Sequence, residues 1–329
     1  MTGDKPPLAM TMGDPAGIGP ELALAAWRGR TAPFAIFAAP GVLAAVARRA
    51  GLEVPIVETD LAGAPAVFSN GLPVVPLRSA VADAPGRPSP ANAAATIESI
   101  ERAVESVRQG EARALVTNPI AKATLYQAGF KHPGHTEYLG ALARRWGAPA
   151  FPVMMIWSEA LAVVPVTIHI PLADAPRALT SELIVKTARI VDRELRARFG
   201  VKRPRLAVAG LNPHAGEGGA MGREEITIIG PAIETLKAEG LDIVGPLSAD
   251  TMFHPKARAG YDVALAMYHD QGLIPAKTLA FDEGVNVTLG LPFVRTSPDH
   301  GTAFDIAGRG LANPTSLIAA VRLADRLTR

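Results

Sequence analysis

Three histidines occupy equivalent positions in three separate segments, each at the end of an apolar run typical of a buried strand. The runs VVPVTIHIP, LAVAGLNPH and VALAMYHDQ end at or near His169, His214 and His269. A single histidine in this position is more often a hydrogen-bonded core residue, but three in the same position favour a common role. Neutral imidazoles suit a divalent metal ion, and three protein ligands with one open position are typical of a catalytic site. We predict such a site, with Asp250 and Asp270 as carboxylates that orient the rings.

The run from Tyr268 to Gly310 carries the densest group of reactive side chains. Lys277, Asn286 and Arg295 follow His269 at intervals of eight or nine residues, each at the edge of a short apolar segment. Lysine is usually a solvated surface charge. In a glycine-rich region at the ends of strands, however, lysine and arginine favour a clamp for a phosphate or carboxylate.

Two further segments allow both a structural and a functional interpretation. In HPGHTEY, His135 and Thr136 precede Glu137, a pattern that suits either a capped helix start or a site for an anionic substrate. The glycine-rich run Gly13 to Glu21 follows the first predicted strand, where backbone N–H groups often hold phosphates. Its spacing matches neither a dinucleotide-binding fingerprint nor a phosphate-binding loop with its lysine, so a tight turn is at least as well supported.

The elements that must position these residues alternate between apolar strands and amphipathic helices. Such alternation predicts an α/β fold with a largely parallel sheet in each of two domains. We expect strands at 8–12, 33–39, 54–59, 72–77, 113–120, 152–157, 161–170, 205–213, 241–248 and 261–267, and helices at 22–28, 41–51, 91–109, 181–199 and 314–329, with one more ending at 240 and two within 122–147.

Composition limits the kind of protein. The chain has 329 residues, 48% hydrophobic and 19% charged, with a net charge of +2 and no basic block, so neither disorder nor nucleic-acid binding is expected. With no cysteine, disulfides, thiolate metal sites and a cysteine nucleophile are excluded. The N-terminal residues do not resemble a signal peptide, and the most apolar stretch, 148–170, is interrupted by prolines and polar residues. We expect a soluble, cytoplasmic protein with no membrane segment.

Several long motifs resemble the 4-hydroxythreonine-4-phosphate dehydrogenase family of pyridoxal phosphate biosynthesis. The match covers nearly the whole chain in the family's order. It rests on MGDPAGIGPE, TNPIAKATL, GHTEYL, HIPL, LNPHAGEGGAMGREE, GPLSADTMF, YHDQGL and GVNVTLGLPFVRTSPDHGTAFDIAGRG.

The resemblance implies an isocitrate/isopropylmalate dehydrogenase-like fold, with two α/β/α domains and a cleft between them. Approximate domain limits are 1–127 plus 303–329 for the first domain and 128–302 for the second, which would carry most metal and substrate residues. It also implies a homodimer with the active site at the subunit interface. The implied metal ligands are His169, His214 and His269, and the implied substrate contacts are His135, Thr136, Lys277, Asn286 and Arg295. Zn²⁺, Co²⁺ and Mg²⁺ are all candidates for the metal.

The segment HGTAFDIAGRGLANP is also similar to the loop of isopropylmalate dehydrogenases that holds the adenosine half of NAD. By this similarity, Asp305 would accept the ribose hydroxyls, which favours NAD over NADP. Phe304 stands where that loop has proline. The implied cofactor contacts are His300, Gly301, Thr302, Asp305 and Asn313.

The implied reaction is the metal-dependent, NAD-dependent oxidation of 4-phosphooxy-L-threonine to 2-amino-3-oxo-4-phosphooxybutanoate, which loses CO₂ to give 3-amino-2-oxopropyl phosphate. The catalytic base could be Lys277, an aspartate near the metal such as Asp250 or Asp270, or a water molecule. One alternative is a related dehydrogenase of another phosphorylated hydroxy acid or of an aromatic cis-dihydrodiol. A second is a metal-dependent hydrolase or lyase, and a non-catalytic binding protein is a third.

Overall fold

A computed structural model describes residues 5–329, which form two compact units. The first unit comprises the chain up to Pro152 together with Leu291–Arg329, and the second is Val153–Gly290. These limits differ from the predicted domains, because the structure assigns 128–152 and 291–302 to the first unit. The reason is packing: Leu139, Leu291 and Phe293 all belong to a core cluster of the first unit. Residues 1–4, on which the prediction that there is no signal peptide partly rests, lie outside the described residues.

The sheet of the first unit has the order β3-β4-β2-β1-β5-β12, and every neighbouring pair is parallel. Its central strands are buried along their full length, which explains why they are almost continuously apolar. Only two residues of the predicted strand 113–120 form β5, and TNPI leaves the sheet as a loop. The strands are β1 (Leu8–Thr11), β2 (Phe34–Ala38), β3 (Ile56–Glu58), β4 (Leu72–Pro76), β5 (Leu115–Val116) and β12 (Arg295–Pro298).

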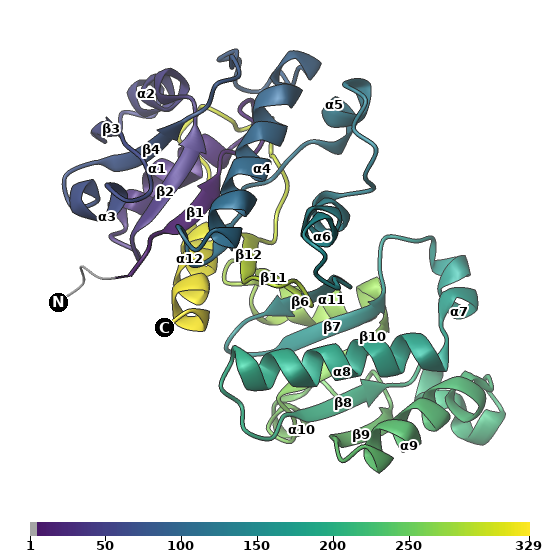
Figure 1. The fold of residues 1–329 in the computed structure, drawn as a ribbon. Helices are drawn as coiled ribbons and strands as arrows, with labels where there is room; N and C mark the ends of the chain where they lie inside the picture. The colour runs from purple at the N-terminus through teal and green to yellow at the C-terminus, as the bar shows by residue number, and fades with distance from the viewer. Residues whose placement is uncertain (1–4) are drawn as a thin grey trace. The chain divides into compact units, whose positions relative to one another are not determined.

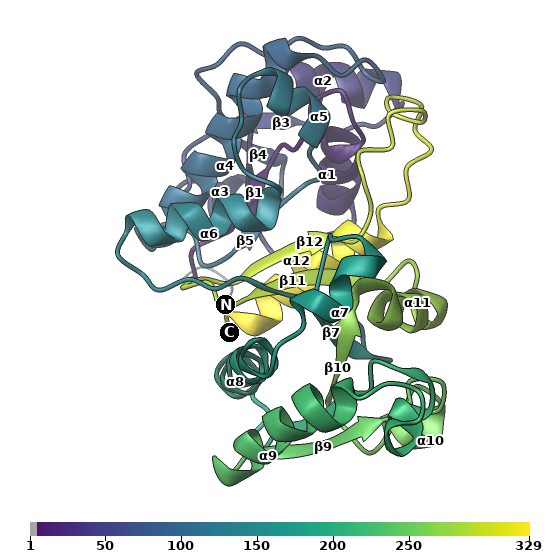
Figure 2. The ribbon, with the colours of Figure 1, turned by 90° about the vertical axis from the view of Figure 1, so that its right-hand side faces the viewer.

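Helices cover both faces of this sheet (Figure 2). One face carries α4 and α6, which bury Ile100, Tyr138 and Leu139 against the sheet residues Ala9 and Phe37. The other carries α1 and α12, which pack against each other, and α12 also contacts β1, β5 and β12. The helices are α1 (Gly19–Arg28), α2 (Pro40–Arg49), α3 (Ala64–Val67), η1 (Pro90–Asn92), α4 (Ala93–Arg108), α5 (Lys122–Gln127), α6 (His135–Arg145) and α12 (Thr315–Leu327).

The sheet of the second unit has the order β11-β6-β7-β10-β8-β9. Its four strands from β7 to β9 are parallel, whereas β6 runs antiparallel to both β7 and β11. The sheet is therefore mixed, with β11 a strand that the sequence pattern did not predict. The strands are β6 (Val153–Trp157), β7 (Ala162–Thr167), β8 (Arg205–Ala209), β9 (Asp242–Leu247), β10 (Val263–Tyr268) and β11 (Val285–Leu289).

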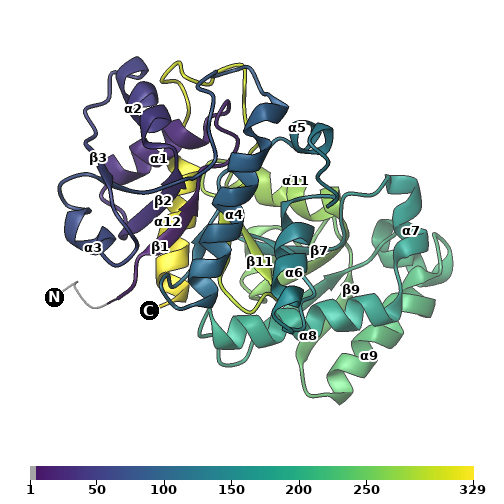
Figure 3. The same ribbon diagram turned by 45° about the horizontal axis from the view of Figure 1, so that its top comes forward.

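Two long helices, α8 and α9, lie side by side on this unit (Figures 1 and 3), and α11 packs against β7 and β10. Because α11 starts at His269, the strand β10 leads directly into a helix, although the glycine and proline that follow the strand favour a loop. Leu273 and Ala276 bury one face of α11 in the core. The helical elements are η2 (Leu172–Asp174), α7 (Ala175–Ala178), α8 (Ser181–Ala197), η3 (Pro213–Gly219), η4 (Glu225–Ile229), α9 (Gly230–Ala238), α10 (Pro255–Arg258) and α11 (His269–Leu279).

None of the helices within residues 5–329 combines the length and apolar character needed to cross a bilayer.

Candidate active site

The four parallel strands of the second unit deliver polar side chains at their carboxyl ends, in the order of the sheet. Such ends are where α/β proteins place ligand sites. β7 is paired with β10, with Thr167 opposite Tyr268, and β10 is paired with β8. After β7, β10, β8 and β9 come His169, His269, His214 and Asp250, respectively.

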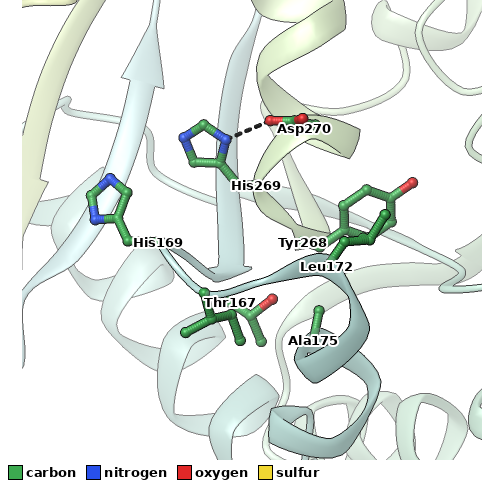
Figure 4. A pocket seen from close by; sticks show the side chains of 8 residues that line it. Thr167, His169, Leu172, Ala175, Tyr268, His269 and Asp270 are labelled. Carbon is green, nitrogen blue, oxygen red and sulfur yellow. Dashed lines mark hydrogen bonds and ion pairs between the residues drawn. The ribbon is translucent and has the colours of Figure 1, made fainter.

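Two of these histidines line one pocket of about 270 Å³ (Figure 4). The ring centroids of His169 and His269 are 5.7 Å apart. The ends of the two strands are tied together, because the Thr167 hydroxyl donates a 2.8 Å hydrogen bond to the carbonyl of Met267. The pocket is lined by Thr167, His169, Ile170, Leu172, Ala175, Tyr268, His269 and Asp270.

Each of the two predicted carboxylates, Asp270 and Asp250, lies near one of the histidines, His269 and His214, respectively. Nδ1 of His269 lies 2.7 Å from Oδ1 of Asp270, an arrangement that directs Nε2 of the ring away from the carboxylate. Asp250 accepts a 2.6 Å hydrogen bond from the Ser248 hydroxyl. This bond chiefly lowers the pKa of Asp250, and the nearby charge of His214 lowers the pKa further.

His214 begins a left-handed turn that the sequence pattern did not predict. Its φ is +54°, and φ stays positive through Gly219. His169 also has a φ of +54°. A left-handed conformation costs a non-glycine residue roughly 1–2 kcal/mol, so such residues persist where the surroundings impose them and cluster at functional sites.

A buried carboxylate, Glu225, holds the start of this turn. Its oxygens accept hydrogen bonds from the backbone N–H of Asn212 at 2.7 Å and from the Asn212 side chain at 3.0 Å. A Cβ on Gly216 would lie only 2.6 Å from Glu225 Oε2, so the turn folds closely around the carboxylate. Gln271 then connects β8 with β10, because its side chain donates to the carbonyl of Gly210 and accepts from the N–H of Met267. Neither Glu225 nor Gln271 was among the predicted site residues.

The donor chemistry suits a metal only in part. His169 and His269 are adjacent imidazoles, and one is oriented by a carboxylate. Across residues 5–329, however, no three His, Cys, Asp or Glu side chains form a ready-made metal site. The structure thus brings two of the predicted ligands together, and the three-histidine site stays a prediction.

The first unit contains a separate cationic site, built around Arg295 at the start of β12. Pairing of β12 with β5 brings this side chain to the TNPI loop, where both Nε and Nη2 donate to the Thr117 hydroxyl at 3.0 and 2.7 Å. Arg295 is 3% exposed. Burial lowers its pKa to about 10, and the charge of Glu137 partly opposes this shift, so the guanidinium stays positive at neutral pH. Thr117 was another residue not predicted.

His135 and Thr136 begin α6 next to this arginine. The cap residue is Gly134, and no side chain caps the helix, so the structure does not support the helix-cap interpretation of this turn. Nε2 of His135 is buried, although the ring as a whole is partly exposed, and it has no hydrogen-bond partner among the described residues. Burial, and then the charge of Arg295, lowers the pKa of His135 well below 6.5. A neutral imidazole, an uncapped helix N-terminus and a buried guanidinium together favour binding of an anion.

The shifted pKa of His135 predicts a specific pH dependence of stability. Below about pH 6.5 the unfolded chain takes up a proton at His135 that the folded chain does not, so acid favours unfolding by at most ~1.4 kcal/mol per pH unit. Above that pH His135 is neutral in both the folded and the unfolded chain, so it no longer favours unfolding. We expect His135→Asn to lose less stability than the unaltered protein between pH 7 and about 5.5 in urea denaturation. His254→Asn, at an exposed helix cap, is the control, and identical pH profiles for His135→Asn and the unaltered protein would contradict the prediction.

Lys277 and Asn286, the other two predicted substrate contacts, lie in the second unit. Lys277 is in the last turn of α11, with Nζ 6.0 Å from the centroid of the Phe281 ring. Asn286 lies on β11, and its Oδ1 is buried and has no hydrogen-bond partner in the part of the chain described.

The predicted cofactor residues lie in the first unit, in the segment between β12 and α12. Asp305 is exposed, whereas Asn313 uses Oδ1 to accept hydrogen bonds from the N–H and the hydroxyl of Thr315 at the start of α12. The Thr302 carbonyl accepts from the N–H of Ile18 at 3.0 Å. Nδ1 of His300 lies 3.0 Å from the carbonyl of Gly301.

The contact between Thr302 and Ile18 also bears on the role of the glycine-rich run Gly13 to Glu21. The carbonyl of Thr302 already occupies the N-terminus of α1, and a Cβ on Gly17 would lie 2.8 Å from the same oxygen. A Cβ on Gly13 would lie 2.6 Å from the carbonyl of Pro119. The glycines therefore allow close backbone packing, which supports the tight-turn interpretation.

Known proteins match the chain over nearly its full length. A family model described as pyridoxal phosphate biosynthetic protein PdxA matches residues 30–324. A 4-hydroxythreonine-4-phosphate dehydrogenase of Methylorubrum populi is 62% identical, covering 100% of this chain and 96% of that protein. One of Bradyrhizobium diazoefficiens is 57% identical, covering 98% and 96%.

Solved structures agree in fold. A 4-hydroxythreonine-4-phosphate dehydrogenase of Klebsiella pneumoniae superposes with a TM-score of 0.87 at 36% identity, covering 99% of this chain and 100% of that one. A terephthalate 1,2-cis-dihydrodiol dehydrogenase of Burkholderia xenovorans gives 0.65 at 29% identity, covering 97% of each.

Fold and relatives together define an α/β dehydrogenase, an enzyme of the oxidoreductase class. The chain belongs to the pyridoxal phosphate biosynthetic protein PdxA family. This membership confirms the predicted family and sets aside the hydrolase, lyase and non-catalytic alternatives. A dehydrogenase of this family implies a nicotinamide cofactor.

Proposed function

We propose that this chain oxidises the secondary alcohol of 4-phosphooxy-L-threonine with NAD, in a metal-dependent reaction of pyridoxine 5′-phosphate biosynthesis. The observation that carries the proposal is the buried guanidinium of Arg295 beside the uncapped N-terminus of α6. A site of this kind suits a phosphate, and relatives at 62% and 57% identity are named for a phosphorylated substrate.

The substrate phosphate is assigned to Arg295, His135 and Thr136. A guanidinium is a strong donor to phosphate oxygens, and the Thr117 hydroxyl fixes the orientation of this one by accepting from Nε and Nη2. The neutral His135 supplies a hydrogen-bond donor without adding a second buried charge. Lys277 and Asn286 are assigned to the polar groups of the same substrate, in line with the family resemblance.

The reacting end of the substrate is assigned to His169, His214 and His269. A divalent ion held there, such as Zn²⁺, Co²⁺ or Mg²⁺, would lower the pKa of the alcohol and stabilise negative charge in the later enolate. Asp270 keeps His269 in the tautomer whose Nε2 is available as a ligand. The strained turn at His214 keeps the third imidazole at the end of β8.

Oxidation removes the alcohol proton to a base and transfers hydride from carbon to NAD, giving NADH and the 3-oxo acid. The carboxylate of this β-keto acid then leaves as CO₂, and the electrons of the broken C–C bond form an enolate, which takes up a proton to give 3-amino-2-oxopropyl phosphate. The candidates for the base are Lys277, Asp270, Asp250 and a water molecule; Asp270 and Asp250 also contact His269 and Ser248, respectively.

We also propose that the protein is a homodimer whose partner completes the active site. Large apolar side chains exposed on the second unit support an interface there. Leu172, Ile274 and Phe281 are 67%, 65% and 75% exposed. Cytoplasmic location is part of the proposal, because charged phosphorylated substrates and NAD do not cross membranes freely.

The test is NADH formation at 340 nm with 4-phosphooxy-L-threonine, before and after chelation and with metal added back. We expect turnover that chelation removes and a divalent metal restores. Turnover unaffected by exhaustive chelation would refute the metal dependence. Metal and NAD binding without turnover would favour a related substrate, and the likeness to a cis-dihydrodiol dehydrogenase makes an aromatic cis-dihydrodiol the first alternative to assay.

A further inference from the structure

The segment from Asp299 to Asn313 contains no helix or strand, so something else must fix its shape. Its internal backbone bonds are two short turns, from Ile306 to Ala303 and from Arg309 to Ile306, both at 3.2 Å. Turns of this kind alone leave a surface loop mobile. The two ends of this loop contact the first turn of α12, through Asp299 with Ser316 and Asn313 with Thr315. Its middle is fastened by the N-terminal end of α1.

Glu21 lies in the first turn of α1 and is 5% exposed. Its Oε2 accepts a hydrogen bond from the N–H of Gly308 at 3.1 Å, and its Oε1 accepts a longer one from Ala312 at 3.5 Å. A buried carboxylate is costly unless it is hydrogen-bonded, and these two N–H groups are its hydrogen-bond donors within residues 5–329. The helix N-terminus adds favourable electrostatics for the negative charge.

The attachment points bracket Asp305 symmetrically. Thr302, three residues before it, is held by Ile18, and Gly308, three residues after it, is held by Glu21. Gly308 suits its place because its φ is +75° and a Cβ there would lie 2.9 Å from Pro85. The exposed Asp305 therefore sits on a turn whose two ends are both fixed to the N-terminal end of α1.

We propose that Glu21 is a positioning residue for nicotinamide cofactor binding. It holds the turn of Asp305 in the shape that receives the ribose hydroxyls, without touching the cofactor itself. This inference rests on the proposed NAD-dependent function and on the cofactor-binding role that the similarity to isopropylmalate dehydrogenases implies for this loop. The acid is needed because a carboxylate can accept from two backbone N–H groups at once, whereas an amide offers a single acceptor oxygen.

The test compares Glu21→Gln with a matched control, Glu98→Gln, in the full-length protein. Glu98 also accepts two backbone N–H bonds in the first unit, from Arg78 and Ser79 at 2.8 Å each, but away from this loop. By calorimetry with NAD, we expect Glu21→Gln to raise Kd about tenfold and Glu98→Gln to leave it unchanged. At saturating NAD, kcat of Glu21→Gln should stay within about twofold, and hydrogen exchange of a 300–313 peptide should accelerate.

Two outcomes would overturn the proposal: an unchanged Kd in Glu21→Gln, or equal increases in both variants. Asp305→Ala separates this from failure of the loop assignment. If Asp305→Ala raises Kd and Glu21→Gln does not, only the positioning role of Glu21 fails. If neither variant raises Kd, the loop is not the cofactor site, and the loop assignment and the role of Glu21 fail together. Should Glu21→Gln not fold, Glu21→Asp can replace it, because aspartate keeps the carboxylate on a shorter side chain. We expect Glu21→Asp to raise Kd for NAD severalfold. An unchanged Kd in Glu21→Asp would overturn the proposal.

Discussion

Arg295→Lys is expected to lower kcat/KM for the phosphorylated substrate by about 100-fold to 1,000-fold. Lysine keeps the positive charge but loses the planar group that donates to Thr117 through two nitrogens and still carries further N–H donors. Because the side chain is 3% exposed, water cannot replace the lost donors. Steady-state kinetics with 4-phosphooxy-L-threonine would measure the loss, most of it in KM.

The matched control is Arg28→Lys, an exposed arginine in the last turn of α1 in the same unit. It should leave kcat/KM within about twofold, since surface charges contribute little. Inorganic phosphate should inhibit the unaltered protein in competition with substrate and inhibit Arg295→Lys more weakly. Arg295→Lys with unchanged KM and unchanged phosphate inhibition would show that the phosphate binds elsewhere.

His214→Ala is expected to reduce metal content and metal-dependent turnover by at least about a thousandfold, because the bound ion supplies several kcal/mol of transition-state stabilisation. His169→Ala and His269→Ala should behave alike. The fold should persist, since each of these three side chains follows its strand and none forms part of the core. Metal analysis after dialysis, together with the NADH assay, measures both effects.

His254→Ala serves as the matched histidine control in the second unit. His254 is exposed and accepts from the N–H of Ala257 at the start of α10, so its loss should cost about 1 kcal/mol of stability with no loss of metal. A His214→Ala protein with full metal content and activity would refute the three-histidine assignment. Such a result would leave the pair at His169 and His269 as the site to examine.

Much of the fold could be predicted locally. The run predicted as strand 161–170 contains β7, Ala162–Thr167, and the predicted helix 181–199 contains α8, Ser181–Ala197. Apolar continuity and helical periodicity are properties of a segment by itself, so they can be recognised without knowledge of the segments that pack against it. The position of each histidine after its strand is local in the same way.

The segment after β10 shows where local patterns misled. HDQGLIPAK contains glycine and proline, which predict a loop, yet α11 runs from His269 to Leu279. Burial of Leu273 and Ala276 against the second unit outweighs the poor helix propensity of these residues. The strand β11 likewise depends on antiparallel pairing with its neighbour β6.

The sequence by itself determined most of the elements, the residue types at the strand ends and, through its motifs, the family. Tertiary structure decided which of those residues meet. Strand order places β10 beside β7, which brings together His169 and His269, and pairing of β12 with β5 carries Arg295 to Thr117 across 178 residues. The physical reason is that strand pairing depends on a partner outside the segment, so no local pattern contains it.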